Sequence, residues 1–127
     1  MDSLKTELTL PYGWIALFWG SMFSGKTDEF VQLLNDAKEW GKLNVYGFKP
    51  KLDKRYGTDV ITSHNGSKFP AYNVKNVKEI EKILKEKDKV KFVNIIGVSE
   101  TQFLDDKIID FCMEQRKNGR KIVLEGL

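Results

Sequence analysis

The sequence predicts an α/β fold, with a largely parallel sheet that carries helices on both faces. Two observations point to this class. Short apolar runs, which are typical of buried strands, alternate with segments in which apolar residues recur every three or four positions, which is typical of helices. A chain of 127 residues has room for one compact domain. Strands that alternate with helices are normally joined by right-handed crossovers and therefore run parallel.

The first half of the chain supplies two strands and a helix. The apolar run over residues 14–19 is bounded by glycines and predicts a strand buried on both faces. Residues 30–37 repeat apolar side chains at helical spacing, and Trp40-Gly41 should end that helix. A second strand is expected over residues 44–48, ended by Lys49-Pro50, because proline has no N–H to donate to a sheet.

The middle of the chain has weaker signals. The charged residues 51–57 predict a loop, and Val60 to Thr62 predict a short strand. Asn65-Gly66 indicates a turn, after which residues 71–74 form a further strand candidate.

The second half continues the alternation. Residues 77–84 place apolar side chains on one helical face and charged side chains on the other. Residues 90–98 predict a second buried strand, and residues 121–124 a final one. Between these strands we expect a helix closed by Asn118-Gly119. Its expected apolar face comprises Leu104, Ile108, Ile109 and Cys112.

Composition excludes several classes of protein. Hydrophobic residues make up 41% of the chain and charged residues 31%, which argues against disordered and collagen-like chains. The formal charge of +3 is spread along the sequence, so we expect no nucleic-acid partner. Apolar runs are too short for a membrane helix, and the expected tail over residues 1–12 lacks signal-peptide features. We therefore expect no membrane partner and a cytoplasmic location.

The chain contains one cysteine and one histidine, so it offers no disulfide framework and no Cys/His zinc site of its own. Cys112 is expected to be a small buried hydrophobic residue. His64 precedes Asn65-Gly66, and we favour a turn residue over a catalytic one.

A phosphate-binding motif lies between the first predicted strand and helix. Its pattern is G-x-x-x-x-G-K-[ST], and it indicates a P-loop NTPase fold of the RecA-like kind. Backbone N–H groups and the helix dipole would hold phosphates, Lys26 would reach them, and Thr27 would bind Mg²⁺. The alternative is an ordinary strand-to-helix turn. The motif consists of Gly20, Ser21, Met22, Phe23, Ser24, Gly25, Lys26 and Thr27.

An acidic residue follows the strand predicted over residues 90–98. That strand would deliver Glu100 to the carboxyl edge of the sheet, where it could accept a proton from a substrate hydroxyl or orient water. Ser99 occupies the place at which a metal-linked aspartate normally follows such a strand. The alternative reading of Glu100 is a helix N-terminal acid beside Asp105 and Asp106.

Further motifs follow the P-loop: Phe48-Lys49-Pro50, Asp53-Lys54-Arg55-Tyr56, Ser63-His64-Asn65-Gly66 and Glu100-Thr101-Gln102-Phe103. Their order and spacing, from about Trp14 to Leu127, resemble the thymidine kinases of the cellular, bacterial and poxviral type. A P-loop alone would indicate only an NTPase. The resemblance implies transfer of the γ-phosphoryl group of ATP to the 5′-hydroxyl of thymidine or deoxyuridine, with Mg²⁺ as cofactor.

The resemblance also implies roles for individual residues. Glu100 corresponds to the general base, and Arg55 is expected to act at the transferring phosphoryl group. Thr27 and Asp53 are expected at the metal. Together with the P-loop, the expected ATP-binding residues are Asp53, Ser99 and Gln102. The expected nucleoside-site residues are Met22, Gln102 and Phe103.

Two departures from the family pattern bear on activity. The family shows Asp-Glu where this chain has Ser99-Glu100, and its zinc element and lasso loop follow the strand that here ends at Glu125-Gly126-Leu127. We therefore expect one P-loop domain over residues 1–127, without the C-terminal zinc and lasso domain.

The expected protein partner is a second copy of the chain or a complementing C-terminal polypeptide. The first alternative function is a catalytically degenerate nucleotide-binding module. The second is a P-loop ATPase acting on nucleic acid or protein, which the lack of a basic stripe disfavours.

Overall fold

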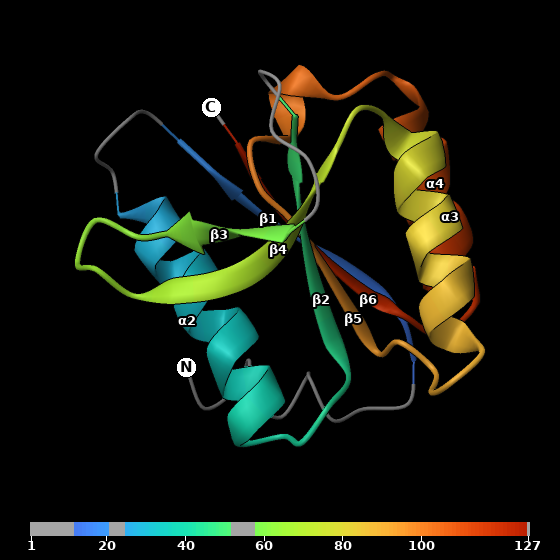
Figure 1. The fold of residues 1–127 in the computed structure, drawn as a ribbon, viewed down its shortest axis with the longest axis horizontal. Helices are drawn as coiled ribbons and strands as arrows, with labels where there is room; N and C mark the ends of the chain where they lie inside the picture. The colour runs from blue at the N-terminus through green and yellow to red at the C-terminus, as the bar shows by residue number, and fades with distance from the viewer. Residues whose placement is uncertain (1–11, 21–24, 52–57, 127) are drawn as a thin grey trace.

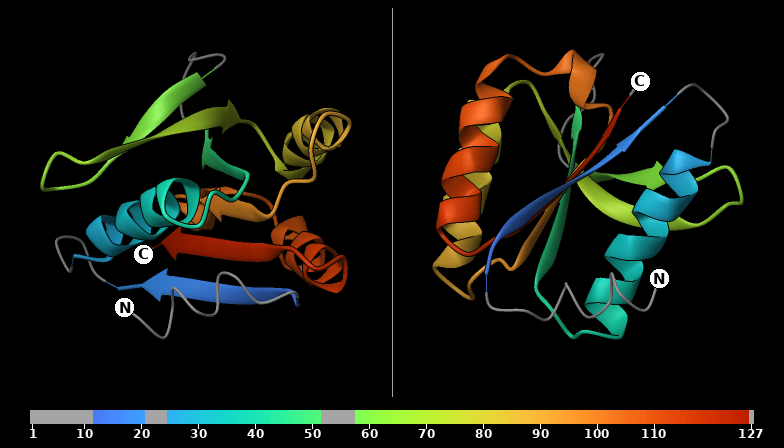
Figure 2. Two further views of the ribbon diagram at one scale, coloured as in Figure 1. Left: turned by 90° about the horizontal axis from the view of Figure 1, so that it is seen from below. Right: turned by 180° about the vertical axis from the view of Figure 1, so that it is seen from behind.

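The computed structural model describes residues 12–20, 25–51 and 58–126, and it has three layers. A mixed sheet lies in the middle, with α2 on one face and α3 and α4 on the other (Figures 1 and 2). The strands are β1 (Trp14–Trp19), β2 (Val45–Pro50), β3 (Thr58–Thr62), β4 (Lys68–Val74), β5 (Ile95–Val98) and β6 (Lys121–Gly126). The helices are α2 (Lys26–Glu39), α3 (Val77–Asp88), α4 (Lys107–Lys117) and the 3-10 turn η1 (Thr101–Phe103).

The six strands have the order β1-β6-β5-β2-β4-β3. Neighbours from β1 to β4 in this order are parallel, and only the β3–β4 hairpin is antiparallel. The structure thus confirms the predicted α/β class with a largely parallel sheet. Because β1, β6, β5 and β2 run in one direction, their carboxyl ends meet at one edge, where α/β proteins bind ligands.

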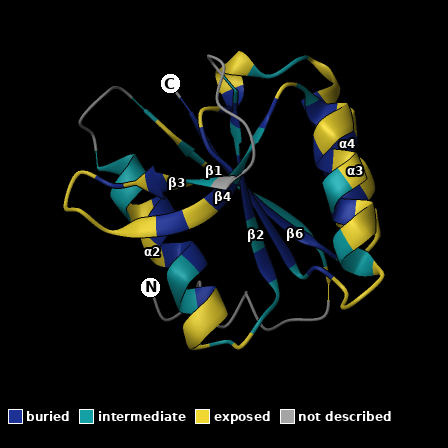
Figure 3. Cartoon of the chain, viewed as in Figure 1, coloured by how far each residue is buried: buried dark blue, intermediate teal, exposed yellow. Residues whose placement is uncertain are grey.

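Two hydrophobic cores lie on the two faces of the sheet. Successive residues of β5 alternate between them: Ile95 packs with α2, and Ile96 packs with α3 and α4. All four residues of β5 are buried, as are those of β6, and the central strands accordingly lie deep in the molecule (Figure 3). The central strands therefore hold the residues at their carboxyl ends in fixed positions.

Glycine at position 97 lets α2 approach the centre of the sheet closely. A Cβ atom at this position would lie 2.7 and 2.8 Å from the two Cδ atoms of Leu34, which is well inside van der Waals contact. Since α2 begins directly after the P-loop, this close contact helps to fix the distance between the P-loop end of the helix and the end of β5.

Several predicted boundaries and turns are confirmed. Helix α2 stops at the expected Trp40-Gly41, and α4 is followed by Asn118 and by Gly119 at φ 86°. The expected turn contains Gly66 at φ 91°. Cys112 is buried, and this burial raises the pKa of its thiol to about 11, as expected for a structural cysteine. No helix of the described segments is long and apolar enough to cross a membrane.

The prediction that residues 14–19 are buried on both faces is wrong. Leu17 and Trp19 are 62% and 52% exposed. The reason is that, among the described strands, β1 stands at the end of the order and pairs with β6 alone. An apolar run cannot distinguish an edge strand from a central one, because that depends on which strands pair beside it.

The predicted bounds of two other strands are wrong. The strand expected over residues 90–98 begins only at Ile95, and Val90 is 91% exposed after α3. Conversely, β2 continues through Pro50. The Lys51 N–H donates to the Val74 carbonyl on the β4 side (2.7 Å), so the Pro50 nitrogen faces the other side, where β5 has already ended.

The predicted apolar face of the last helix is partly wrong. Helix α4 begins at Lys107, so Leu104 precedes it, and Ile109 is 67% exposed. The buried face instead comprises Ile108, Phe111, Cys112 and Gln115. Those positions follow helical spacing from Ile108, which leaves its neighbour Ile109 on the outer face.

We predict that Gly97→Ala destabilises the fold by about 1–3 kcal/mol, because the added methyl group overlaps Leu34. Urea unfolding measures the loss. The matched control is a double-mutant cycle with Leu34→Val, in which the combined variant should lose less than the sum of the single losses. Additive losses would contradict a direct clash between the two side chains.

Candidate functional site

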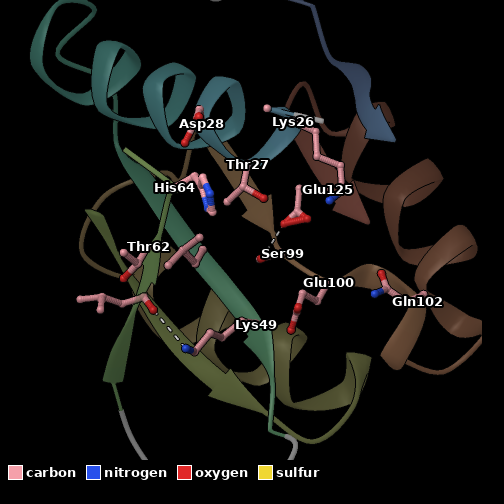
Figure 4. A pocket seen from close by; sticks show the side chains of 13 residues that line it. Lys26, Thr27, Asp28, Lys49, Thr62, His64, Ser99, Glu100, Gln102 and Glu125 are labelled. Atoms are coloured by element: carbon pink, nitrogen blue, oxygen red, sulfur yellow. Dashed lines mark hydrogen bonds between the residues drawn. The ribbon is translucent and has the colours of Figure 1, made fainter. Parts of the chain in front are cut away.

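An open cavity of about 320 Å³ lies at the carboxyl edge of the sheet, beside the start of α2. The residues that line it come from the start of α2, from the ends of several strands and from the turns next to them (Figure 4). They are Gly25, Lys26, Thr27, Asp28, Lys49, Val60, Ile61, Thr62, His64, Ser99, Glu100, Gln102 and Glu125. The fold therefore brings together residues from widely separated parts of the sequence.

The P-loop end of the cavity is formed by the start of α2. Gly25 immediately precedes the helix at φ 84°, a left-handed conformation that glycine adopts without steric cost. Lys26 and Thr27 are the first two helical residues, so their backbone N–H groups and the positive end of the helix dipole lie at the cavity. This arrangement suits an anion such as a phosphate group.

A buried pair of polar side chains lies at the base of the cavity. The Ser99 hydroxyl, just after β5, donates a hydrogen bond of 2.9 Å to Oε1 of Glu125 on β6. Burial raises the pKa of the Glu125 carboxyl, and the nearby charge of Glu100 raises it further. The Ser99 hydrogen bond, the charge of Lys26 and a bond from the Glu100 backbone act in the opposite direction on this pKa.

Glu100 has an unusual backbone. Its φ of 50° and ψ of 48° place it in the left-handed region, where a residue with a side chain loses roughly 1 kcal/mol. The conformation is held from both sides, since the Ser99 N–H donates to the Phe48 carbonyl and the Phe103 N–H donates to the Glu100 carbonyl. Strained residues of this kind gather at functional sites. Here the turn presents the exposed Glu100 side chain to the cavity.

The short turn η1 is fastened to the ends of the central strands. The Thr101 hydroxyl contacts the Val98 carbonyl at 3.3 Å and the Glu125 carbonyl at 3.1 Å. Gln102 lies against Gly126, where a Cβ would be 2.7 Å from the Gln102 side-chain oxygen and 2.7 Å from the Trp19 ring. The glycine at the end of β6 thus leaves the space that Gln102 occupies.

The far wall of the cavity carries a lysine that the sequence analysis did not assign to the site. Lys49, on β2, forms an ion pair with Asp59 at 2.8 Å. It also donates a hydrogen bond of 3.0 Å to the Val60 carbonyl (Figure 4). His64 is in the predicted turn and also lines the cavity. The following Asn65 N–H donates to Asp28 at 3.3 Å, which joins this turn to α2.

The described residues fall into two groups relative to the sequence predictions. Those that line the cavity are Gly25, Lys26, Thr27, Ser99, Glu100 and Gln102. Gly20 follows β1 and Phe103 is exposed on η1, and neither is among the residues that line it. The predicted residues Ser21, Met22, Phe23, Ser24, Asp53 and Arg55 lie outside the described residues.

Sequence analysis missed Lys49, Asp28, Thr62 and Glu125 as residues of the cavity. Lys49 belongs to one of the motifs noted above, but the sequence did not show which way it pointed. Glu125 had a usable signal, because it is an acid that directly follows the apolar run over residues 122–124, at the end of the strand that should carry ligand-binding residues.

Comparison with known proteins identifies the family. A family model described as thymidine kinase matches residues 13–127. The chain belongs to the thymidine kinase family. It is 39% identical over 115 residues to a thymidine kinase of Mycoplasma capricolum subsp. capricolum, covering 91% of this chain and 54% of that protein.

Two further relatives give the same result. Thymidine kinases of Mycoplasma mycoides subsp. mycoides and Mesoplasma florum are each 36% identical over 115 residues, or 91% of this chain. The match covers 54% of the first and 56% of the second. The chain therefore spans about half the length of the family members that it matches.

We predict that Glu125→Gln stabilises the fold at neutral pH. In the folded chain this carboxyl binds a proton more readily than in the unfolded chain, so stability falls as pH rises from the ordinary pKa of 4.5 through the raised one. Glutamine keeps an acceptor for Ser99 without a buried charge. The melting temperature should rise by about 2–5 °C at pH 8, with the gain shrinking toward pH 4.5.

Thermal unfolding across this pH range measures the effect. Glu114→Gln removes a carboxylate from the exposed side of α4 and is the matched control, which should follow the parent chain. A Glu125→Gln variant that is less stable than the parent at pH 8 would show that the charged form is favourably placed.

Proposed function

We propose that this chain provides the phosphate-binding half of a thymidine kinase, which transfers the γ-phosphoryl group of ATP to the 5′-hydroxyl of thymidine or deoxyuridine. The observation that carries the proposal is that the start of α2 and the Glu100 side chain converge on one cavity. Phosphoryl transfer needs a phosphate cradle and a proton acceptor near the same reacting group, and family membership supports this reaction.

The start of α2 would bind the triphosphate. Its N–H groups point along the helix axis toward the cavity, and the Lys26 ammonium adds a full positive charge beside them. Charge spreads over the phosphoryl oxygens during transfer, so fixed donors at this place stabilise the transition state more than the ground state. On the family resemblance, Arg55 would add a second positive charge.

The oxygen donors in the cavity fit Mg²⁺. No group of three or more His, Cys, Asp or Glu side chains suited to a metal occurs among the residues that the structure describes. Magnesium does not need one, because beside a nucleotide it is held by one or two protein oxygens, phosphates and water. The Thr27 hydroxyl is the proposed protein ligand, with Asp53 nearby on the family resemblance. When bound, the ion would neutralise phosphate charge.

Glu100 would act as general base. Its exposed carboxylate faces the cavity, and its strained backbone is fixed by hydrogen bonds on both sides, so it is held in position before substrate arrives. It would take the proton of the 5′-hydroxyl as that oxygen bonds to the γ-phosphorus, while the bond from this phosphorus to the bridging oxygen breaks and ADP leaves. Gln102 lies next to Glu100 on the cavity wall and would contact the nucleoside, with Phe103 and Met22 as further nucleoside residues.

The remaining half of the site is proposed to come from the part of the family's sequence that the match does not cover. The chain spans about half the length of its relatives, and the cavity is open. A complementing C-terminal polypeptide would enclose the base. A second copy of this chain is the other partner that we propose, and the exposed Leu17 and Trp19 on β1 offer apolar surface to either.

One observation favours a different function. Ser99 replaces the acid that the family places after β5, which is what a catalytically degenerate nucleotide-binding module would show. Such a module would bind ATP and fail to transfer phosphate even when the rest of the site is supplied. The two functions therefore differ in turnover and agree in nucleotide binding.

We predict that Lys26→Ala lowers the affinity for ADP by about 10- to 100-fold, because a hydrogen bond to a charged group contributes about 1.5–3 kcal/mol. Titration calorimetry with Mg²⁺ measures this. Lys85→Ala is the matched control, since it removes the same charge from the exposed face of α3. Equal binding by Lys26→Ala and the parent chain would show that residues 20–27 form only a structural turn.

We predict little thymidine phosphorylation by the chain alone. Turnover should be restored by adding a second polypeptide, which consists of the part of the Mycoplasma capricolum thymidine kinase that the match does not cover. Glu100→Gln should lower the restored rate by about 100-fold or more. Transfer of labelled phosphate to thymidine measures both. Nucleotide binding without any restored turnover would favour the degenerate module, and rapid turnover by the chain alone would contradict the need for a partner.

A further inference from the structure

Glu125 is a carboxylate in a place where carboxylates are rarely found. It is 3% exposed, on a strand whose residues are all buried. Buried acids normally have a partner that accounts for the cost of removing them from water. Among the described residues, this acid interacts with the Ser99 hydroxyl, the Glu100 backbone N–H and the charges of Lys26 and Glu100. These contacts orient the Glu125 side chain, but they offset only part of the free-energy cost of removing its charge from water.

Strand register explains why Glu125 meets Ser99. Val98 on β5 is level with Leu124 on β6, so the next residues along the two strands are neighbours as well. The Ser99 hydroxyl lies 2.9 Å from Oε1 of Glu125. The Glu125 carboxylate thus reaches the end of β5 from the adjacent strand, beside the position at which the family places an aspartate.

The direction of the side chain is equally informative. Glu125 points into the cavity rather than into either core, and in Figure 4 its carboxylate lies among Lys26, Thr27 and Ser99. The Thr27 hydroxyl is the proposed protein ligand of Mg²⁺. A carboxylate near such an ion accepts hydrogen bonds from metal-bound water and so fixes the coordination geometry.

We infer that Glu125 supplies from β6 the metal-orienting carboxylate that the family places at the end of β5, where this chain has Ser99. The inference rests on the proposed function, because it needs a nucleotide and Mg²⁺ at the start of α2. On this inference Ser99 no longer favours a degenerate module, since Glu125 provides a carboxylate beside the end of β5. Ser99 is then a positioning residue whose hydroxyl holds Oε1.

We expect the site to tolerate a carboxylate at position 99 or at position 125, but not at both. An aspartate at position 99 beside Glu125 would set two acids against each other at hydrogen-bonding distance, and like charges so close cannot both ionise easily. Ser99→Asp alone should therefore fail to strengthen Mg²⁺-dependent binding. The same substitution together with Glu125→Ala should restore it, because a single acid is again present.

The test measures ADP binding by titration calorimetry over a range of Mg²⁺ concentrations and in EDTA. Glu125→Gln should still bind ADP in EDTA. The Mg²⁺ concentration at which half of the metal-dependent increase in ADP affinity is reached should rise by about 10- to 100-fold. Glu114→Gln, on exposed α4, is the matched control and should resemble the parent. Ser99→Asp/Glu125→Ala should return the Mg²⁺ requirement toward that of the parent.

The outcomes separate this inference from the proposed function. If Glu125→Gln needs no more Mg²⁺ than the parent, the role of Glu125 is overturned and the nucleotide site stands. If the parent binds no ADP in either condition, the nucleotide site is overturned and this inference with it. If Glu125→Gln loses ADP binding even in EDTA, the double variant Ser99→Asp/Glu125→Ala decides. A recovered Mg²⁺ response in the double variant supports the inference, and the lack of such a response overturns it.

Discussion

The parallel pairing of β5 with β6 is the interaction on which the rest of the structure depends. Both strands are buried on both faces, so each hydrophobic core is built against them. Their register also sets Ser99 level with Glu125 and gives η1 its anchor through Thr101. A shift of one residue would exchange the two faces of a strand and separate the polar groups of the cavity, so fold and site are specified by the same pairing.

The sequence predicts the fold class because alternating apolar patterns and turn residues are local signals. Where the prediction fails, the deciding contact is distant in sequence. Phe92 belongs to the apolar run that predicts a longer β5, yet its ring lies 4.6 Å from the Arg120 guanidinium. That arginine is buried, and it bonds Gln115, Asp88 and the Val93 carbonyl. The spacing of apolar residues in the sequence cannot predict a buried polar network of this kind, because the members of the network come from separate elements.

The candidate site divides in the same way. Lys26, Thr27 and Glu100 are found from motifs because a short stretch of chain carries both the residues and the turn that presents them. Lys49 and Glu125 were not predicted, because the order of the strands in the sheet brings each of them to the cavity. The structure gives the location of these residues, and the role assigned to each site residue stays a prediction, including the roles of the residues outside the described segments.

The contact between Ser99 and Glu125 also has an evolutionary consequence. When two side chains share one location, the effect of a substitution at either position depends on the residue at the other. If single substitutions were to replace an acid on β5 by an acid on β6, the intermediate sequence would carry either both acids or neither. Small polar residues such as serine ease that replacement, because a hydroxyl tolerates a carboxylate neighbour. Chains of this fold are therefore best compared by the location of the acid in space rather than by the sequence position that holds it.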